Sequence, residues 1–159
     1  MGRTNGEYMR TYLVVIDESP EARIALRFAA IRARKTGGAV HVLALVEQAD
    51  FVAFGGVQAT MAADAEAKAT EIVQQAAGEI MAELGTRPAI TVREGDAVKV
   101  VRDVLEENPD ISLLVLGASA NGAPGPLVSH FTGNDCGSLT RPVIIIPGSF
   151  DDALIDQMA

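Results

Sequence analysis

Two apolar runs decide the fold: Thr11-Tyr-Leu-Val-Val-Ile-Asp17 and Ile111-Ser-Leu-Leu-Val-Leu-Gly117. Short, unbroken apolar runs are typical of strands in a parallel sheet that is covered on both faces. Ligands bind such open sheets beyond the carboxyl ends of the strands, where the strand order reverses. If the two runs are neighbours at that point, Asp17 supplies a hydrogen-bond acceptor and Gly117 opens a glycine-lined loop. The two runs therefore predict a nucleotide pocket.

Helical patterns alternate with apolar runs along the chain. Ser19-Pro20 supplies an N-cap with proline at the first helical position, and Gly37-Gly38 ends that helix. The alternation predicts one α/β domain with an open five-stranded parallel sheet and helices on both faces. The strands are expected at 11–17, 39–46, 88–93, 111–116 and 142–146, and the later helices at 57–84, from Asp96 to Asn108, and within 126–132.

The composition excludes several classes of protein. The 159 residues suffice for one domain with a sizeable core, and 48% hydrophobic with 21% charged residues is a globular composition. A formal net charge of -8 argues against general nucleic-acid binding. No apolar stretch approaches the roughly 20 residues of a membrane span, and residues 1–10 have no signal-like apolar core. We expect a cytoplasmic protein without nucleic-acid or membrane partners, with residues 1–10 as a flexible arm.

Five stretches resemble the universal stress protein family. They are Tyr12-Leu-Val-Val-Ile-Asp-Glu-Ser-Pro-Glu21, Val42-Leu-Ala-Leu-Val46, Val92-Arg-Glu-Gly-Asp96, Leu113-Leu-Val-Leu-Gly117 and Arg141-Pro-Val-Ile-Ile-Ile146. Each stretch is weakly specific, but their order and spacing extend over about 11–147. The resemblance implies the strand order 3-2-1-4-5, homodimers and a role in stress resistance. Some members of this family bind ATP and others do not.

The resemblance assigns two residues to the nucleoside. In ATP-binding members the aspartate after the first strand contacts the nucleoside, and Asp17 matches it. An ionised carboxylate accepts hydrogen bonds from ribose hydroxyls well; the alternative is that Asp17 helps to cap the helix that begins at Pro20. Backbone groups near the end of the second strand contact adenine in those members, and Val46 matches that position. For Val46, plain core packing is the alternative.

The loop after the fourth strand matches the family's phosphate pattern only in part. That pattern is Gly-x2-Gly-x9-Gly-Ser/Thr, and glycines let backbone N–H groups approach a phosphate. Gly117 matches the first position, and Gly122 with Gly125 repeats the first half five residues later. The remaining positions hold other residues: Ala120, His130 and Phe131.

The same loop is expected to lead into a helix that begins at Gly125-Pro126. The N-terminus of that helix, aided by Ser129, would hold a phosphate. No Lys or Arg occurs between Arg102 and Arg141, so ATP would need Mg²⁺ or a basic residue from elsewhere. The candidate residues for binding ATP with Mg²⁺, or another purine nucleotide, are Asp17, Val46, Gly117, Gly122, Gly125 and Ser129.

The other reactive residues suggest no catalytic or metal site. His41 lies in a strand and is expected in the core or at an edge. His130 either contacts an anion when protonated or sits on a helix surface. Asp135 disfavours the thiolate of Cys136, the single cysteine, and two histidines and one cysteine give no metal-ligand spacing. Gly55-Gly56 is either a hinge before the long helix or a plain loop.

The helix after Pro20 has two apolar faces. If the small residues pack on the sheet, the bulky face needs a cover from a neighbouring helix, the C-terminal tail or a partner. If the bulky residues face the sheet instead, the alanines are exposed, and the sequence does not decide between the two. The small face holds Ala22, Leu26, Ala29 and Ala33, and the bulky face holds Ile24, Phe28 and Ile31.

Residues 142–146 would be an uncharged, β-branched edge strand, which can pair with another chain. The simplest pairing is with its twofold mate, in a homodimer. The residues of this interface would be Val143, Ile144, Ile145 and Ile146.

The domain is expected to end near residue 148, followed by a short helix within 149–159. Ser149 can cap this helix, and Phe150, Leu154 and Met158 form a stripe spaced by four. A helix of this length needs docking, either on its own domain or across the dimer; a disordered tail is the alternative.

These features together predict a sensor or adaptor domain with an unidentified protein partner. Nothing in the sequence supplies a convincing general base, so any ATP hydrolysis would be slow. The alternatives are a nucleotide-dependent enzyme on a related fold, such as an adenylyl-transfer domain, and a structural interaction module that binds no nucleotide.

Overall fold

A computed structural model describes residues 9–46 and 56–159. Most of the arm predicted over residues 1–10, and Gly55 of the possible hinge, lie outside the described residues. The elements follow the predicted alternation, with bounds within two residues of those expected. They are β1 (Thr11–Ile16), α1 (Pro20–Thr36), β2 (Ala39–Val46), α2 (Gly56–Leu84), β3 (Ala89–Glu94), α3 (Ala97–Glu107), β4 (Ile111–Ala118), α4 (Pro126–Phe131), the 3-10 turn η1 (Cys136–Ser138), β5 (Val143–Pro147) and α5 (Asp152–Met158).

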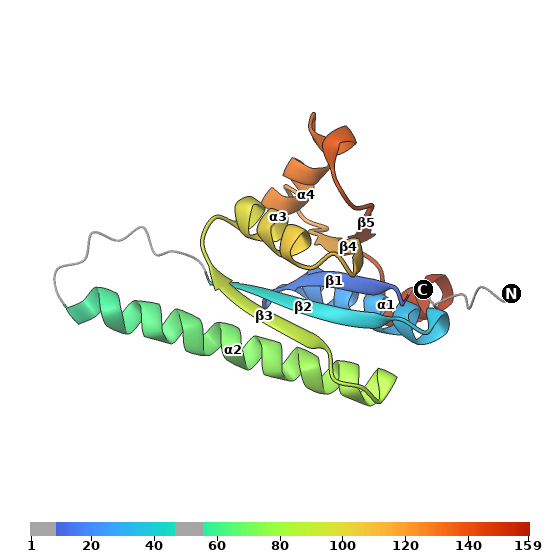
Figure 1. Ribbon diagram of the computed structural model, residues 1–159, viewed down its shortest axis with the longest axis horizontal. Helices are drawn as coiled ribbons and strands as arrows, with labels where there is room; N and C mark the ends of the chain where they lie inside the picture. Colours follow the sequence, from blue (N-terminus) through green and yellow to red (C-terminus); the bar gives the residue numbers. More distant parts are fainter. Residues whose placement is uncertain (1–8, 47–55) are drawn as a thin grey trace, which may run out of the picture.

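The predicted fold is confirmed as a parallel sheet of order β3-β2-β1-β4-β5. Helices cover both faces: α1, α2 and α5 pack on one apolar cluster, and α3 and α4 pack on the other (Figure 1). The strand order reverses between β1 and β4, which are hydrogen-bonded neighbours. A ligand crevice is therefore expected at the carboxyl ends of these two strands.

Short-range signals set the ends of α1. The Ser19 hydroxyl accepts a hydrogen bond from the Ala22 amide at 3.2 Å, and Pro20 occupies the first helical turn. Gly37 ends the helix in the left-handed conformation, with φ of 65°. The start of α1 is thereby fixed at the mouth of the crevice, with three residues between the end of β1 and the helix.

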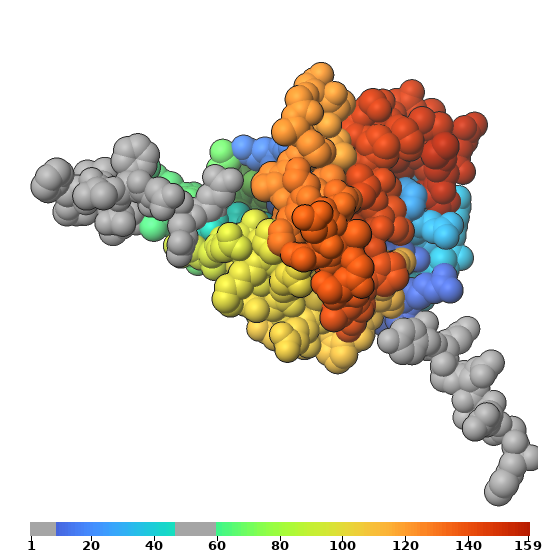
Figure 2. Space-filling view, turned by 90° about the horizontal axis from the view of Figure 1, so that it is seen from above, coloured from blue at the N-terminus to red at the C-terminus, as the bar shows by residue number. Residues whose placement is uncertain are grey.

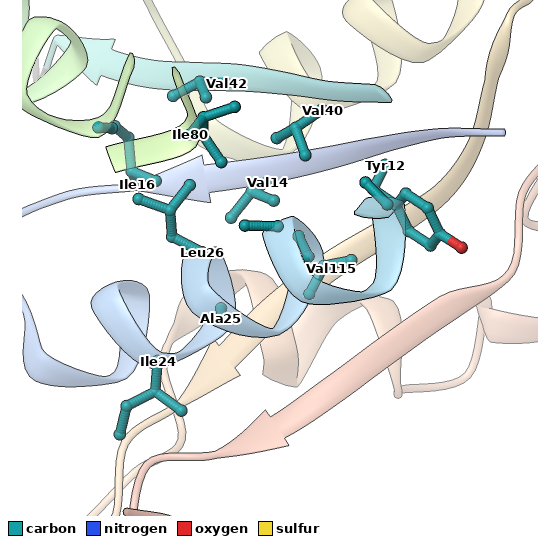
Figure 3. Close-up of a cluster of buried hydrophobic side chains, with 14 of the residues drawn as sticks. Tyr12, Val14, Ile16, Ile24, Ala25, Leu26, Val40, Val42, Ile80 and Val115 are labelled. Atoms are coloured by element: carbon teal, nitrogen blue, oxygen red, sulfur yellow. The ribbon is translucent and has the colours of Figure 1, made fainter. Parts of the chain in front are cut away.

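Helix α1 packs on the sheet through its small residues, so the alternative with exposed alanines is wrong. Ala25, Ala29 and Ala33 are fully buried in the cluster that also holds Val14 of β1 and Val115 of β4 (Figure 3). Ile24 and Ile31 are buried as well, because α2 and α5 flank α1. The C-terminal tail thus supplies part of the cover that the bulky face of α1 requires.

The tail forms the expected helix and docks on its own domain, but two details of the prediction were wrong. Asp151, not Ser149, caps α5: its carboxylate accepts a hydrogen bond from the Leu154 amide at 2.8 Å. The anchor is Ile155, which is fully buried, whereas Met158 is 58% exposed. The i, i+4 spacing selected the wrong residues because a seven-residue helix presents less than two turns of periodicity.

His41 on β2 is buried on the face of the sheet that carries α3. Its Nε2 lies 2.7 Å from the Thr91 hydroxyl of β3. Burial lowers the pKa of His41; Asp110 opposes this shift, and Arg93 adds to it. The core interpretation of His41 is confirmed, and the folded protein favours the neutral imidazole.

This burial predicts a pH dependence of stability. Below pH 6.5 the unfolded chain binds a proton at His41 more readily than the folded chain, so stability falls as the pH falls below that value. The slope from this histidine is at most about 1.4 kcal/mol per pH unit. Urea unfolding of His41→Gln between pH 7.5 and 5.5 should show a flatter slope than the parent. Equal slopes for His41→Gln and the parent would contradict this role of His41.

Candidate functional site

A cleft of about 560 Å³ lies at the carboxyl ends of β1 and β4. Asp17, Gly117 and Gly125, three of the residues predicted from the sequence, line it together. The floor is apolar and includes Val15, Leu45 and Leu116, and the first turns of α1, α3 and α4 close its sides. The cleft therefore occupies the position at which an open parallel sheet binds ligands.

Asp17 is exposed at the mouth of the cleft. Its Oδ1 accepts a hydrogen bond from the Ser19 amide at 2.7 Å, which tightens the turn between β1 and α1. The N-cap itself is Ser19, so the carboxylate supports the cap without being the cap. Within the described residues, Oδ2 has no partner. Asp17 thus has a structural role and still presents a charged acceptor to a ligand.

Gly117 is required by packing at the point where α1 meets the end of β4. A Cβ atom built on Gly117 would overlap the backbone carbonyl of Glu21 and come within 3.0 Å of the Glu21 Cβ. The backbone of the first turn of α1 therefore rests directly on β4. A glycine at this position follows from this contact, whether or not a phosphate approaches the loop.

The loop from Ser119 to Gly125 holds Gly122 and Gly125, and only one of them lies at the cleft. The Ser119 amide donates a hydrogen bond to the Pro124 carbonyl at 3.1 Å, which folds the loop back on itself. Gly125 borders the cleft and, with φ of 112°, begins α4 as predicted. Gly122 is exposed and does not line the cleft.

Ser129 and Val46 also lie away from the cleft. Ser129 is exposed, and its amide continues the α4 ladder by donating to Gly125 at 3.0 Å. The Val46 side chain is buried in the cluster under α1 and α2, as its alternative interpretation stated. Because side chains alternate along a strand, the neighbouring Leu45 lines the cleft, and an adenine contact through the Val46 backbone stays a prediction.

Two acidic residues of the cleft were not among the candidates. Glu21 lies in the first turn of α1, and Asp96 caps α3 by accepting a hydrogen bond from the Lys99 amide at 2.9 Å. Asp96 follows β3 directly through Gly95, so its position after a strand was the available signal. Glu21 carried no comparable signal, because only the contact with β4 brings it to the cleft.

The charged residues that line the cleft are all acidic. Asp17, Glu21 and Asp96 are its charged residues, and the described lining contains no Lys, Arg or His. A triphosphate placed here would meet uncompensated negative charge, so it fits only together with a divalent cation. A ligand with fewer phosphate charges meets less repulsion.

The remaining reactive residues lie elsewhere. His130 Nε2 is 3.2 Å from the Arg102 guanidinium, which also lies over the Phe131 ring. Cys136 is exposed in η1, beside a separate groove that runs along β5. No helix in the described part of the chain is long and apolar enough to cross a membrane.

The fold and the cleft define a single α/β domain with a ligand crevice at the reversal of strand order. The model of the universal stress protein family matches residues 9–147. The chain therefore belongs to the universal stress protein family. No curated protein gave a significant match to the chain.

Solved structures share this fold at low sequence identity. Universal stress protein UspA from Lactobacillus plantarum is 21% identical, with a TM-score of 0.74, 89% of this chain covered and 99% of that one. An Archaeoglobus fulgidus universal stress protein in complex with dAMP is 22% identical, with a TM-score of 0.58 and coverages of 87% and 98%. An Arabidopsis thaliana family protein with AMP bound is 15% identical, with a TM-score of 0.56 and coverages of 87% and 91%.

The contact at Gly117 predicts opposite effects for two Gly→Ala changes. Gly117→Ala should destabilise the protein by about 1–3 kcal/mol, because its Cβ meets backbone that cannot move aside alone. Gly78→Ala, in the middle of α2 with nothing within 4 Å of the new Cβ, should stabilise it by roughly 0.5–1 kcal/mol. Urea unfolding measures both, and equal stabilities would contradict the packing role of Gly117.

Proposed function

We propose that this chain is a sensor or adaptor domain that binds an adenine nucleotide in the cleft beyond β1 and β4. The observation that carries the proposal is the convergence of Asp17, Gly117 and Gly125 on one cleft at the reversal of strand order. The volume of the cleft lies within the range of small-molecule sites. Solved family structures with AMP and dAMP support an adenine nucleotide as the ligand class.

Each part of the cleft has a distinct part in this proposal. The apolar floor around Leu45 and Leu116 packs against the base, and Asp17 accepts hydrogen bonds from the ribose hydroxyls. The phosphate lies beside Gly125 and the first turn of α4, where Leu127 and Val128 have amides without intrahelical acceptors. Because the lining is acidic, we expect AMP to bind more tightly than free ATP, and ATP to require Mg²⁺.

The proposed role is binding rather than turnover. The described lining offers carboxylates as its only titratable side chains. The exposed Asp17 carboxylate already accepts a hydrogen bond from the Ser19 amide and is a weak candidate for a general base at neutral pH. The bound nucleotide would instead report the energy state of the cell to a partner protein.

Asp17→Asn tests the proposed contact with the ribose. Asparagine keeps an oxygen for the Ser19 amide but loses the charge, so the turn before α1 should be retained. Loss of charge-assisted hydrogen bonds should weaken AMP binding roughly tenfold. Isothermal titration calorimetry with AMP, and with ATP in the presence and absence of Mg²⁺, measures the affinities.

The matched control is Asp64→Asn, an exposed position on α2 away from the cleft, which should bind AMP like the parent. No heat change with millimolar AMP or with ATP and Mg²⁺ would refute nucleotide binding. If Asp17→Asn bound AMP as tightly as the parent or more tightly, Asp17 would not be the ribose acceptor.

We also propose that the chain forms a homodimer through β5. This strand is an edge of the sheet and pairs with β4 alone among the described strands. Val143, Ile144 and Ile145 stay partly exposed on it, and they carry no charge to discourage pairing. An apolar groove that includes Phe131 and Leu139 runs beside the same edge.

Ile145→Lys should convert the dimer into a monomer, because a charge at the paired edge is costly to bury. Light scattering at several concentrations measures the mass, and circular dichroism verifies the fold. Ile90→Lys places the same charge on β3, the opposite edge of the sheet, and should leave the dimer intact. A dimeric Ile145→Lys protein would exclude β5 as the interface.

A further inference from the structure

Helix α5 is fastened to α1 by contacts between residues that are far apart in the sequence. The Arg27 guanidinium donates two hydrogen bonds of 2.9 Å to the Asp156 carboxylate. Arg23 pairs with Asp152 at 3.4 Å. Between the two pairs, the fully buried Ile155 inserts into the core. The basic outer side of α1 and the acidic side of α5 are thus complementary around one apolar anchor.

The helical structure of α5 depends on its tertiary contacts. This helix contains seven residues, too few to be stable as a helix without tertiary contacts. When its anchor leaves α1, the segment therefore loses its helical structure as well. The family model matches to residue 147, so the tail helix lies outside the matched residues.

The link between β5 and α5 packs against segments that border the candidate cleft. The Gly148 amide donates a hydrogen bond to the Ala118 carbonyl at 2.7 Å, at the end of β4. A Cβ atom on Gly148 would lie 2.6 Å from that carbonyl and 3.2 Å from the Ala120 amide nitrogen. It would also lie 3.1 Å from the Glu21 Cβ, in the first turn of α1. Three segments that shape the cleft therefore meet at Gly148.

The loop after β4 connects this junction to the cleft. It runs from Ser119 to Gly125, closes on the hydrogen bond from Ser119 to Pro124, and ends at the cleft. In Figure 2 this orange loop stands beside the red C-terminal segment, and α5 lies against the light-blue part of α1. Helix α5 begins four residues after Gly148, and the Ala118 carbonyl that accepts the hydrogen bond from Gly148 belongs to the residue before Ser119.

We propose that α5 is a strap with a docked and an undocked state, and that docking holds the loop after β4 in the conformation that shapes the cleft. Undocking of α5 loosens the loop, and a ligand that orders the loop favours docking in return. The inference concerns the tail and the loop of the free protein, so it does not depend on an adenine nucleotide as the ligand.

Hydrogen exchange of the full-length chain, followed by NMR at single amides, tests the strap. The double variant Asp152→Asn/Asp156→Asn removes both ion pairs from the surface and keeps the Ile155 anchor. Loss of two exposed pairs should speed exchange at Leu154 to Met158 about fivefold. The Ser119 amide, which lies outside the tail, should exchange at least about twofold faster.

The matched control is Asp103→Asn/Glu107→Gln, which removes two ion pairs and the same charge from α3. It should leave the exchange of Ser119 and the tail at parental rates. The strap is refuted if the tail exchanges faster while Ser119 does not, if the tail is unaffected by loss of its pairs, or if the control accelerates Ser119 equally.

A second pair of variants tests the junction itself. Gly148→Ala introduces a Cβ against Ala118 and Ala120, so it should accelerate exchange in the tail and at Ser119 together. Gly137→Ala adds the same atom in open space and should change neither. A Gly148→Ala protein in which only one of the two regions responds would overturn the coupling. Calorimetry with AMP addresses the ligand separately, so the two proposals can fail independently.

Discussion

The first turn of α1 rests on the end of β4 with no side chain between the two backbones, and the rest of the structure follows from this contact. Gly117 permits it, and the buried alanines at 25, 29 and 33 continue the same close approach along the sheet. The turn from β1 to α1 must therefore be short, and the Asp17–Ser19 hydrogen bond closes it. The same contact between α1 and β4 therefore belongs both to the packing of the core and to the wall of the cleft.

The fold could be predicted because its signals are local. Ser19 and Pro20 start α1, Gly37 stops it, and Asp96 caps α3, each through contacts that span three to five residues. Unbroken apolar runs identify strands that are buried on both faces. The order of the strands is not local, and it followed from the family resemblance. Given that order, the position of the cleft is a matter of topology.

The site was only partly predictable. The positions of the phosphate pattern were assigned by their spacing in the sequence, whereas the hydrogen bonds of the loop after β4 decide which of its residues reach the cleft. The Ser119–Pro124 bond turns the loop so that Gly122 is exposed and Gly125 reaches the cleft. Strand alternation turns the Leu45 side chain, not that of Val46, toward the cleft. Glu21 enters through a tertiary contact that leaves no mark in the sequence. In the tail, the cap is Asp151 instead of the predicted Ser149, and the buried anchor is Ile155 instead of Met158. The sequence offered several residues for each of these two roles.

Helix α1 connects the cleft with the tail helix α5, because its opposite sides carry different kinds of residues. Its alanine side determines how closely the helix approaches β4 and thus the width of the cleft, while Arg23 and Arg27 on its outer side hold α5. Gly148 joins the tail to the loop after β4, through the hydrogen bond from its amide to the Ala118 carbonyl. Although the loop after β4 matches the family's phosphate pattern only in part, Gly117 and Gly148 stand where a Cβ atom would meet the backbone of a neighbouring segment. Steric contact with neighbouring backbone accounts for these two glycines. Any ligand must fit the cleft whose shape results from this close packing.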